Sequence, residues 1–354
     1  MRINFVLPSY GESGGLKVIY KYASEFSRQG HEVVLYYPLI PYNLGKDTNT
    51  FYVCLMKMKG FFIRCFHAIR KDRYNSLCKE LYRPVLCISN SMIRNADATI
   101  ATAWPTAYSV SALDEKKGKK YYFIQDFEIW DNYERGKDSY FLPLKKITIS
   151  KWIANQLKQI GIKEEIPVIT NGINTNDFYY TLRNKRDIVC LMLFHPLEKK
   201  GVNQGVKAFE IAKESCPNLK LKMFGLTKPI DLEIVCDFIE NPSKIELANL
   251  YSDADIFIFP SLEEGWGLTV IEAMLSGCAV VGSNTGCLFE LGINNYNALI
   301  TDPGDIVALS NSIVMLYNND DLRKKLSVNG HSTATQLMWE PSVNCFLSIL
   351  SSTQ

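Results

Sequence analysis

The feature of the sequence that most restricts its fold is a series of short apolar runs separated by segments of helical periodicity. Residues 3–7 form the first run. A loop with three glycines follows at residues 8–15, then a helical pattern at 16–28 and a second run at 32–37. Further runs lie at residues 98–101, 120–124, 146–149, 167–170, 188–194, 219–224, 256–259, 279–282 and 298–300. Because strands covered on both faces read as continuous apolar runs, the alternation predicts parallel sheets flanked by helices.

The length of the chain predicts two such sheets rather than one. A single hydrophobic core rarely serves more than about 250 residues, and this chain has 354. Asn171 and Gly172 follow one apolar run, and a charged turn at residues 183–187 precedes the next. We expect three parts: an N-terminal Rossmann-like domain (1–170), a C-terminal Rossmann-like domain (171–335) and a last segment (336–354). The helical stretch in the last segment either completes the second domain or crosses back to the first.

Composition bears on where the protein is found. No apolar run approaches the roughly 18 residues that cross a bilayer, and the apolar start of the chain lacks the length of a signal peptide. The ten cysteines are scattered without a C-x-x-C pair, which favours reduced core residues over disulfides or a zinc site. We therefore expect a cytoplasmic protein.

Charge is divided unequally along the chain. Residues 1–165 hold 25 Lys and Arg against 16 Asp and Glu, a net charge of +9, and the rest of the chain holds 14 against 21. The basic half is expected to face an anionic partner. Within it, six basic residues alternate with bulky apolar ones over residues 57–74, as in helices that lie on membranes. Two hypotheses stay open: peripheral association with the inner face of the plasma membrane, or a core-facing helix with a basic solvent side.

The segment from residue 257 to residue 277 carries the most chemical information. It reads as a buried strand, a loop with two glycines, and an amphipathic helix that ends at Gly277. N–H groups at a glycine-flanked helix start bind anions, so a diphosphate would fit there. Glu264 lies on the loop and Glu272 about two turns into the helix. Because eight helical residues span close to 12 Å, the two carboxylates would contact different parts of an extended ligand. Alternatively, Glu264 complements the helix dipole and Glu272 is a solvated surface residue.

This segment resembles the E-x7-E signature of the family 4 retaining glycosyltransferases. The resemblance covers essentially the second half of the chain, and the first half more thinly. It includes Thr170 to Asn174 with Phe178, residues 247–255, residues 259–261, residues 277–283, Thr285-Gly286 with Glu290, residues 297–300, residues 303–305 and Trp339-Glu340. The family implies an α/β chain of the GT-B fold, in which two Rossmann-like parallel-sheet domains face a cleft. It also implies a reaction without a catalytic metal or a cofactor.

The family's site residues carry over position by position. Glu272 would accept hydrogen bonds from the ribose hydroxyls of the nucleotide, Glu264 would hold the donor sugar near its reacting carbon, and Lys200 would neutralise the departing diphosphate. Backbone N–H groups would bind sugar or diphosphate oxygens at Gly265, Trp266, Gly267, Leu268 and Thr269. In the first half, Gly14 and Gly15 are similar to paired glycines that face the diphosphate or the acceptor. A tight strand-to-helix turn explains this pair as well.

One departure from the family pattern concerns the diphosphate. Members usually place an arginine, in a Gly-Arg pair, about five positions before the lysine, and this chain has Phe194-His195-Pro196 there. A protonated His195 would donate to a phosphate oxygen. More of the diphosphate charge would then be neutralised by Lys200 and Lys199.

The other departure concerns the donor sugar. Many members carry a histidine in a strand-end motif, and Gln125 stands in its place. A glutamine hydrogen-bonds a sugar hydroxyl but cannot act as a general base. The stretch 121–130 resembles a subgroup of bacterial polysaccharide transferases that includes rhamnosyltransferases.

The resemblance predicts a retaining, metal-independent hexosyltransferase. It would move a sugar from a UDP-, GDP- or dTDP-linked donor to a glycan or lipid-linked glycan in cell-surface polysaccharide assembly. The leaving diphosphate would take the acceptor proton on the same face of the sugar, so no protein base is required. One alternative is a nucleotide-sugar-binding subunit of the same fold with weak catalysis. Another is a dinucleotide-dependent oxidoreductase, whose G-x-G-x-x-G spacing Gly11, Gly14 and Gly15 do not satisfy. No motif indicates binding of nucleic acid.

Overall fold

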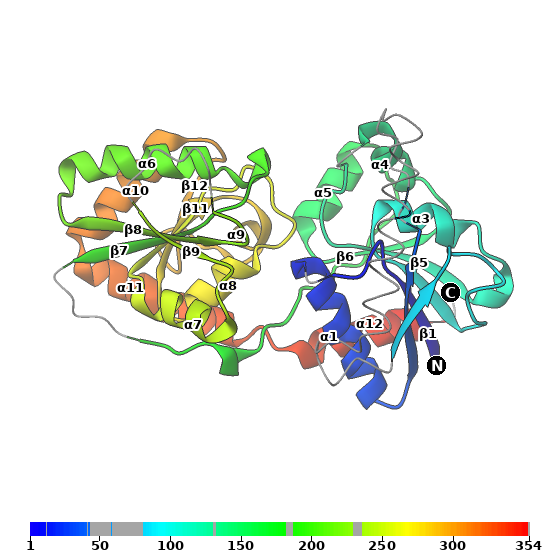
Figure 1. The fold of residues 1–354 in the computed structure, drawn as a ribbon. Helices are drawn as coiled ribbons and strands as arrows, with labels where there is room; N and C mark the ends of the chain where they lie inside the picture. Colours follow the sequence, from blue (N-terminus) through cyan, green and yellow to red (C-terminus); the bar gives the residue numbers. More distant parts are fainter. Residues whose placement is uncertain are drawn as a thin grey trace. The chain divides into compact units, whose positions relative to one another are not determined.

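The structure is a computed structural model that describes residues 1–11, 13–40, 42, 58, 81–129, 132–181, 187–228 and 236–352. The chain divides into two compact units (Figure 1). Unit 1 comprises Met1–Ile169 and Glu340–Gln354, and unit 2 comprises Thr170–Trp339. The basic stretch at 57–74 lies outside the described residues, apart from position 58. No helix of the described part is both long and apolar enough to span a bilayer.

Unit 1 contains a six-stranded parallel sheet in the order β3-β2-β1-β4-β5-β6. Its register is set by apolar residues, with Phe5 opposite both Leu35 and Ile100. The strands are β1 (Arg2–Val6), β2 (Glu32–Pro38), β3 (Tyr82–Val85), β4 (Ala98–Ala101), β5 (Lys119–Ile124) and β6 (Lys145–Thr148). The apolar run at 167–170, which the sequence places among the strands, adds only an isolated bridge between Val168 and Thr148.

Helices cover both faces of this sheet (Figure 1). They are α1 (Gly14–Arg28), α3 (Trp104–Ser111), α4 (Tyr133–Ser139), α5 (Lys151–Gln159) and α12 (Trp339–Ser351). The last helix completes the core of unit 1, because the ring of Phe346 lies 4.9 to 6.3 Å, between ring centroids, from the rings of Phe5, Tyr22, Phe26 and Phe123. The two ends of the chain therefore stabilise the same unit.

Unit 2 contains a second six-stranded parallel sheet, in the order β12-β11-β10-β7-β8-β9. Its strands are β7 (Ile188–Leu193), β8 (Leu219–Gly225), β9 (Asp237–Glu240), β10 (Ile256–Phe259), β11 (Ala279–Ser283) and β12 (Leu299–Thr301). Its helices are α6 (Val202–Ser215), α7 (Lys244–Asp253), α8 (Leu268–Leu275), α9 (Gly286–Leu291), α10 (Ile306–Asn318) and α11 (Asp320–Thr335). Helices α6 and α10 lie on one face of the sheet, and α7 and α8 on the other (Figure 1).

Each sheet has a point where the strand order reverses. In unit 1 it lies between β1 and β4, and in unit 2 between β7 and β10. At such a point the loops that leave neighbouring carboxyl ends run in opposite directions, which opens a crevice where ligands of α/β proteins bind. The loops of interest are therefore those after β1 and β4 in unit 1 and those after β7 and β10 in unit 2.

Candidate active site

The loops after β7 and β10 are joined by backbone hydrogen bonds. The N–H groups of Leu262 and Glu263 donate to the carbonyl oxygen of Lys199 over 2.8 and 3.2 Å. Gly201, at a φ of +63°, lies so close that a β-carbon there would be 1.9 Å from the carbonyl oxygen of Pro260. Only glycine fits this position, and the contact holds the start of α6 against the loop that leads to α8.

This junction brings Lys200 and Glu264 together. The Nζ of Lys200 donates to both carboxylate oxygens, at 2.8 and 2.7 Å, and the side chains are 18% and 14% exposed. The Oγ of Ser261 donates to Oε2 of the same carboxylate over 3.3 Å. A lysine ammonium and a carboxylate in such contact make a charge-assisted interaction that is well shielded from water. Two residues 64 positions apart thus form the charged centre of unit 2.

Two glycines of positive φ let the backbone lie close to the side chain of Glu264. A β-carbon at Gly267 would lie 3.3 Å from its Cγ, and one at Gly286 would lie 2.9 Å from the same atom. At Gly286 it would also lie 2.5 Å from the carbonyl oxygen of Trp266, which accepts the N–H of Cys287. Gly286 belongs to the motif found in the sequence, but no role was expected for it. Its close approach to Glu264 shows that it shapes the carboxylate's surroundings.

Helix starts add partial positive charge beside this pair. Helix α8 follows Gly267 and helix α6 follows Gly201, and among the described residues neither start has a side-chain cap. Uncapped N–H groups and the helix dipole favour an anion in this position. Of the residues whose N–H groups are expected to bind donor oxygens, Gly265 and Trp266 are buried, while Gly267, Leu268 and Thr269 are partly exposed.

Glu272 lies on the side of α8 that faces helix α7. It is half-buried rather than solvated, and its Oε2 accepts a 2.8 Å hydrogen bond from the hydroxyl of Tyr251. Burial first, and then the charge of Glu272, raise the pKa of Tyr251 well above its usual range. The phenol therefore stays protonated and donates to the carboxylate.

His195 follows β7 and is half-buried. Its pKa is lowered from the ordinary value, chiefly by burial and then by the charges of Lys200 and Lys199. The protonated donor expected from the sequence is therefore disfavoured. The Nδ1 of the ring accepts the N–H of Leu197 over 3.2 Å, which assigns the proton of the neutral ring to Nε2. His195 thus offers a neutral N–H rather than a positive charge.

In unit 1 the structure brings Gln125 to the glycine loop. A β-carbon at Gly15 would lie 3.5 Å from the Nε2 of Gln125, whereas one at Gly14 would meet no described atom within 4 Å. Neither glycine has a positive φ, and Ser13 caps α1 by accepting the N–H of Leu16. The backbone of the turn therefore does not demand glycine at these positions. Gly15 therefore lets the chain pass in contact with Gln125, and among the described residues the space beside Gly14 is open.

Glu128 is a buried carboxylate that the sequence did not single out. It accepts the N–H of Trp104 over 2.7 Å and the hydroxyl of Tyr122 over 2.8 Å, and its own N–H donates to the hydroxyl of Tyr140. Glu128 lies three positions after Gln125, and its carboxylate caps the start of α3. These bonds anchor the segment that carries Gln125. The cap residue of α3 itself, Ala103, has no side-chain oxygen, and this weak N-cap was the one signal that could have indicated a distant cap.

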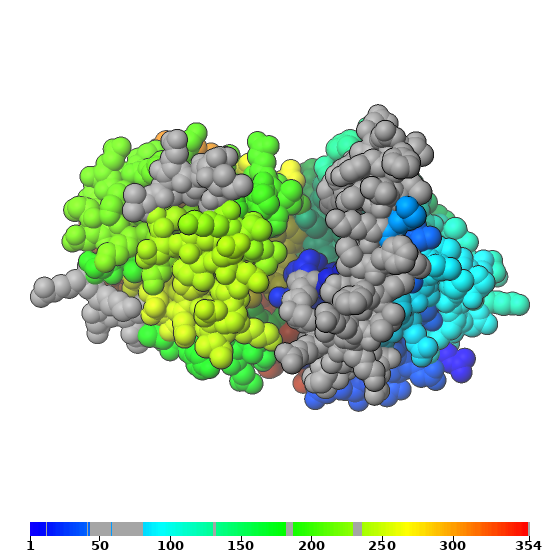
Figure 2. Space-filling view, viewed as in Figure 1, coloured from blue at the N-terminus to red at the C-terminus, as the bar shows by residue number. Residues whose placement is uncertain are grey.

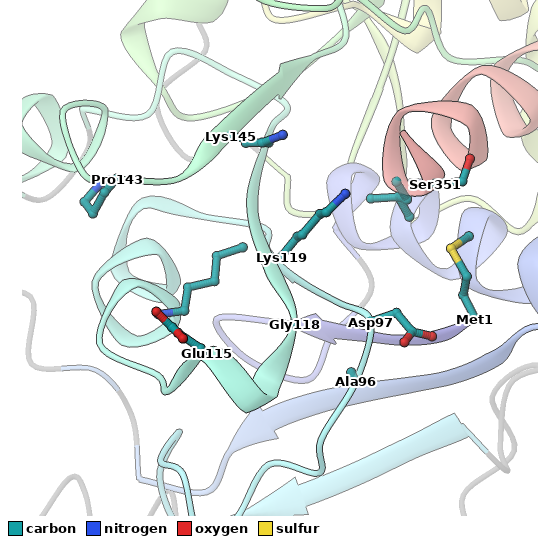
Figure 3. Close-up of a pocket in the computed structure, with 11 residues that line it drawn as sticks. Met1, Ala96, Asp97, Glu115, Gly118, Lys119, Pro143, Lys145 and Ser351 are labelled. Atoms are coloured by element: carbon teal, nitrogen blue, oxygen red, sulfur yellow. The ribbon is translucent and has the colours of Figure 1, made fainter. Parts of the chain in front are cut away.

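A hollow of the described surface lies away from these residues. It is lined by Met1, Asp97, Lys119 and Lys145 among others, which precede or begin strands of unit 1 (Figure 3). It therefore opens at the amino ends of the strands, whereas all the predicted site residues of unit 1 follow carboxyl ends. Among the described residues, no three His, Cys, Asp or Glu side chains come together as a metal site.

Comparison with known proteins accounts for the architecture of unit 2. Residues 175–333 match the sequence model of the family described as "Glycosyl transferases group 1". The matching residues lie within unit 2 and make up less than half of the chain. The matching stretch includes Lys200, Glu264 and Glu272.

The chain is similar in sequence to proteins that are named as glycosyltransferases. It is 30% identical over 207 residues to an uncharacterized glycosyltransferase of Methanocaldococcus jannaschii, which covers 56% of this chain and 57% of the relative. It is 23% identical over 258 residues to a capsular polysaccharide biosynthesis glycosyltransferase of Staphylococcus aureus, which covers 64% and 66%. The chain thus matches less than two thirds of the length of either relative.

The likeness in fold extends beyond the residues that match the family model. The structure matches Anabaena HepE, solved in complex with UDP and glucose, over the whole of both chains with a TM-score of 0.71 and 15% identity. Two six-stranded parallel sheets with flanking helices are the elements of the GT-B fold. The predicted fold class, two Rossmann-like parallel-sheet domains of the GT-B type, is confirmed.

Proposed function

We propose that the chain is a retaining family 4 glycosyltransferase that transfers a sugar from a nucleotide-sugar donor to a glycan or lipid-linked glycan in polysaccharide assembly. The observation that carries the proposal is the contact between Lys200 and Glu264 at the point where the strand order of unit 2 reverses. The contact lies beside two uncapped helix starts, inside the segment that matches the family.

The geometry suggests how the leaving group is stabilised. A diphosphate at the starts of α6 and α8 would compete with Glu264 for the ammonium of Lys200. Donor binding would then release the Glu264 carboxylate to hold the sugar hydroxyls, while Lys200 balances the charge that develops on the diphosphate. The neutral His195 would add a hydrogen bond from Nε2. In this scheme the two carboxylates of the E-x7-E motif bind different parts of the donor. Glu264 binds the sugar and Glu272 binds the ribose.

The proposed reaction needs neither a metal ion nor a cofactor. The diphosphate itself would accept the acceptor's proton on the face from which it leaves, which gives retention of configuration. In unit 1, the space beside Gly14 and the amide of Gln125 suit a neutral, hydroxyl-rich partner. We propose the acceptor is a growing glycan, free or lipid-linked, met in the cytoplasm or at the inner face of the membrane. Flotation with anionic liposomes at low salt tests the membrane part, and absence of binding would refute that part alone.

The decisive experiment screens thermal stability against UDP-, GDP- and dTDP-sugars and then follows hydrolysis and transfer. A bound donor raises the melting temperature, and at a fixed concentration a tighter donor raises it more. Nuclear magnetic resonance of the product sugar reports the anomer. We expect one donor class to stabilise the protein and to yield a retained product. If no nucleotide sugar stabilises the protein, the proposal fails at its first step.

A second candidate is a nucleotide-sugar-binding subunit with weak catalysis. The neutral state of His195 favours it, because the usual arginine is absent and the histidine does not replace its charge. The two candidates differ in the screen described above. Stabilisation by a donor without measurable hydrolysis or transfer would identify the binding subunit.

A further inference from the structure

We infer that Tyr251 is a positioning residue of the donor site, whose buried hydroxyl holds the Glu272 carboxylate in the orientation that binds ribose. The inference rests on the proposed function, in which Glu272 binds the ribose of a nucleotide sugar. The hydroxyl of Tyr251 donates to Oε2 of Glu272 over 2.8 Å. No role in the site follows for Tyr251 from the sequence.

The position of Tyr251 is fixed from several sides. Helix α7 lies at the surface of unit 2, in the yellow-green region that faces the viewer in Figure 2. Tyr251 is on its inner side with no exposed area. Its ring centroid lies 5.7 to 5.8 Å from the ring centroids of Phe178, Phe224 and Phe257. A ring enclosed in this way has little freedom to change rotamer, so its hydroxyl is a fixed donor.

The backbone around the pair is tied as well. The thiol of Cys278, just after α8, donates to the carbonyl oxygen of Tyr251 over 3.2 Å, so it joins the end of α7 to the end of α8. The hydroxyl of Ser276 donates to the carbonyl oxygen of Glu272 over 3.0 Å. The Cys278 bond thus ties together the ends of the two helices that carry the phenol and the carboxylate, and the Ser276 bond closes the last turn of α8.

A fixed hydrogen-bond donor would orient the Glu272 carboxylate before the ribose binds. A glutamate side chain turns about three bonds, and a ribose diol is bound well only when the carboxylate is already oriented. An ionised carboxylate accepts about four hydrogen bonds, so the bond from Tyr251 leaves capacity for ligand hydroxyls. A buried tyrosine hydroxyl usually has a hydrogen-bond partner, and for Tyr251 that partner is the Glu272 carboxylate.

The test replaces Tyr251 by phenylalanine, which removes one oxygen atom and leaves the ring. Calorimetry measures the binding of UDP and of 2′-deoxy-UDP. If the screen selects GDP, then GDP and its 2′-deoxy form are used instead. Steady-state kinetics give kcat and the KM for the donor. We expect Tyr251→Phe to weaken binding of the ribonucleotide about fivefold, to raise the donor KM alike, and to leave kcat within about twofold. Binding of the deoxynucleotide falls less, because it offers fewer ribose contacts to lose.

A matched control and a double variant complete the design. Tyr121 is a fully buried tyrosine of unit 1 whose hydroxyl donates to the carbonyl oxygen of Ile349, and Tyr121→Phe is expected to leave binding of UDP unchanged. In a Glu272→Ala background, Tyr251→Phe is expected to have no further effect on binding. Should Tyr251→Phe lower the melting temperature, the ratio of UDP to deoxy-UDP affinity still decides, because general destabilisation weakens both nucleotides alike.

The outcomes separate the inference from the function on which it rests. If Glu272→Ala weakens the binding of UDP and Tyr251→Phe changes neither binding nor the ribose to deoxyribose ratio, the role of Tyr251 is refuted and the proposed function stands. If Glu272→Ala also has no effect on any nucleotide, the assignment of Glu272 to ribose fails, and the role of Tyr251 fails with it.

Discussion

The carboxyl ends of the two sheets have the same topology and different chemistry. In unit 2 they present charged side chains that already contact partners, Lys200 with Glu264 and Glu272 with Tyr251. In unit 1 they present a glycine pair and the amide of Gln125. The buried carboxylate there, Glu128, is used to cap a helix. Under the proposed function, unit 2 would bind the charged leaving group and unit 1 would bind neutral hydroxyls.

The largest expected effect comes from removing the cation of unit 2. Lys200→Ala should lower the rate of sugar transfer about 100-fold or more, because it removes charge stabilisation of the departing diphosphate. It also leaves the half-buried Glu264 without its ion pair. The measurement is steady-state transfer, with Lys220→Ala as a control, since Lys220 forms an exposed ion pair with Asp187 in the same unit. A rate within threefold of the unaltered enzyme would break the proposed division of roles between the units.

The next largest effect tests how closely the backbone of unit 2 packs around the side chain of Glu264. Gly286→Ala should destabilise the protein by about 2 to 4 kcal/mol, because the new methyl group meets the carbonyl oxygen of Trp266 at 2.5 Å and the φ is +53°. Gly304→Ala is the matched control, with a φ of +83° and its nearest neighbour at 3.6 Å. Chemical denaturation measures both variants. Equal losses would mean that the backbone, and not the crowding around Glu264, accounts for the cost.

A smaller effect should come from unit 1 and should differ in kind. Gln125→Ala is expected to slow sugar transfer about tenfold, a loss typical of one hydrogen bond to a substrate, and to leave the affinity for UDP or GDP unchanged. Kinetics and calorimetry on the same preparation separate the two. A loss of nucleotide affinity comparable to that of Glu272→Ala would contradict the separation of roles between the units.

The smallest effect concerns the protonation of His195. Its pKa in the folded protein is below the ordinary value of 6.5, so the unfolded chain binds more protons between the two values and stability falls as the pH drops through 6.5. His195→Asn removes this contribution and should make the melting temperature less sensitive to pH between about 7.5 and 5.5. The pKa of His31, in unit 1, is lowered as well. The pH dependence of the melting temperature of His31→Asn is therefore measured beside that of His195→Asn. An unchanged pH profile for His195→Asn would show that the ring is not held neutral.

Alternating apolar runs and helical segments were enough to predict two parallel sheets, because buried parallel strands need continuous apolar sequence. The same rule missed β3 and β9. Both are short edge strands with exposed residues, and their burial patterns are not those of a core strand. It also placed a strand at residues 167–170, where an apolar stretch meets the sheet only through Val168. Edge pairing depends on what lies beside a strand, and local pattern does not record that.

For the site, the sequence determined which residues matter as candidates, because a glycine loop before a helix and two glutamates eight positions apart form a local motif. Only the tertiary structure decided what each one touches. Lys200 contacts Glu264 because β7 and β10 are neighbours in the sheet, and Glu128 reaches Trp104 because β4 and β5 are. Tyr251 reaches Glu272 because α7 and α8 lie on the same face. A contact across dozens of residues depends on strand order and helix placement, which are set by the packing of the whole core.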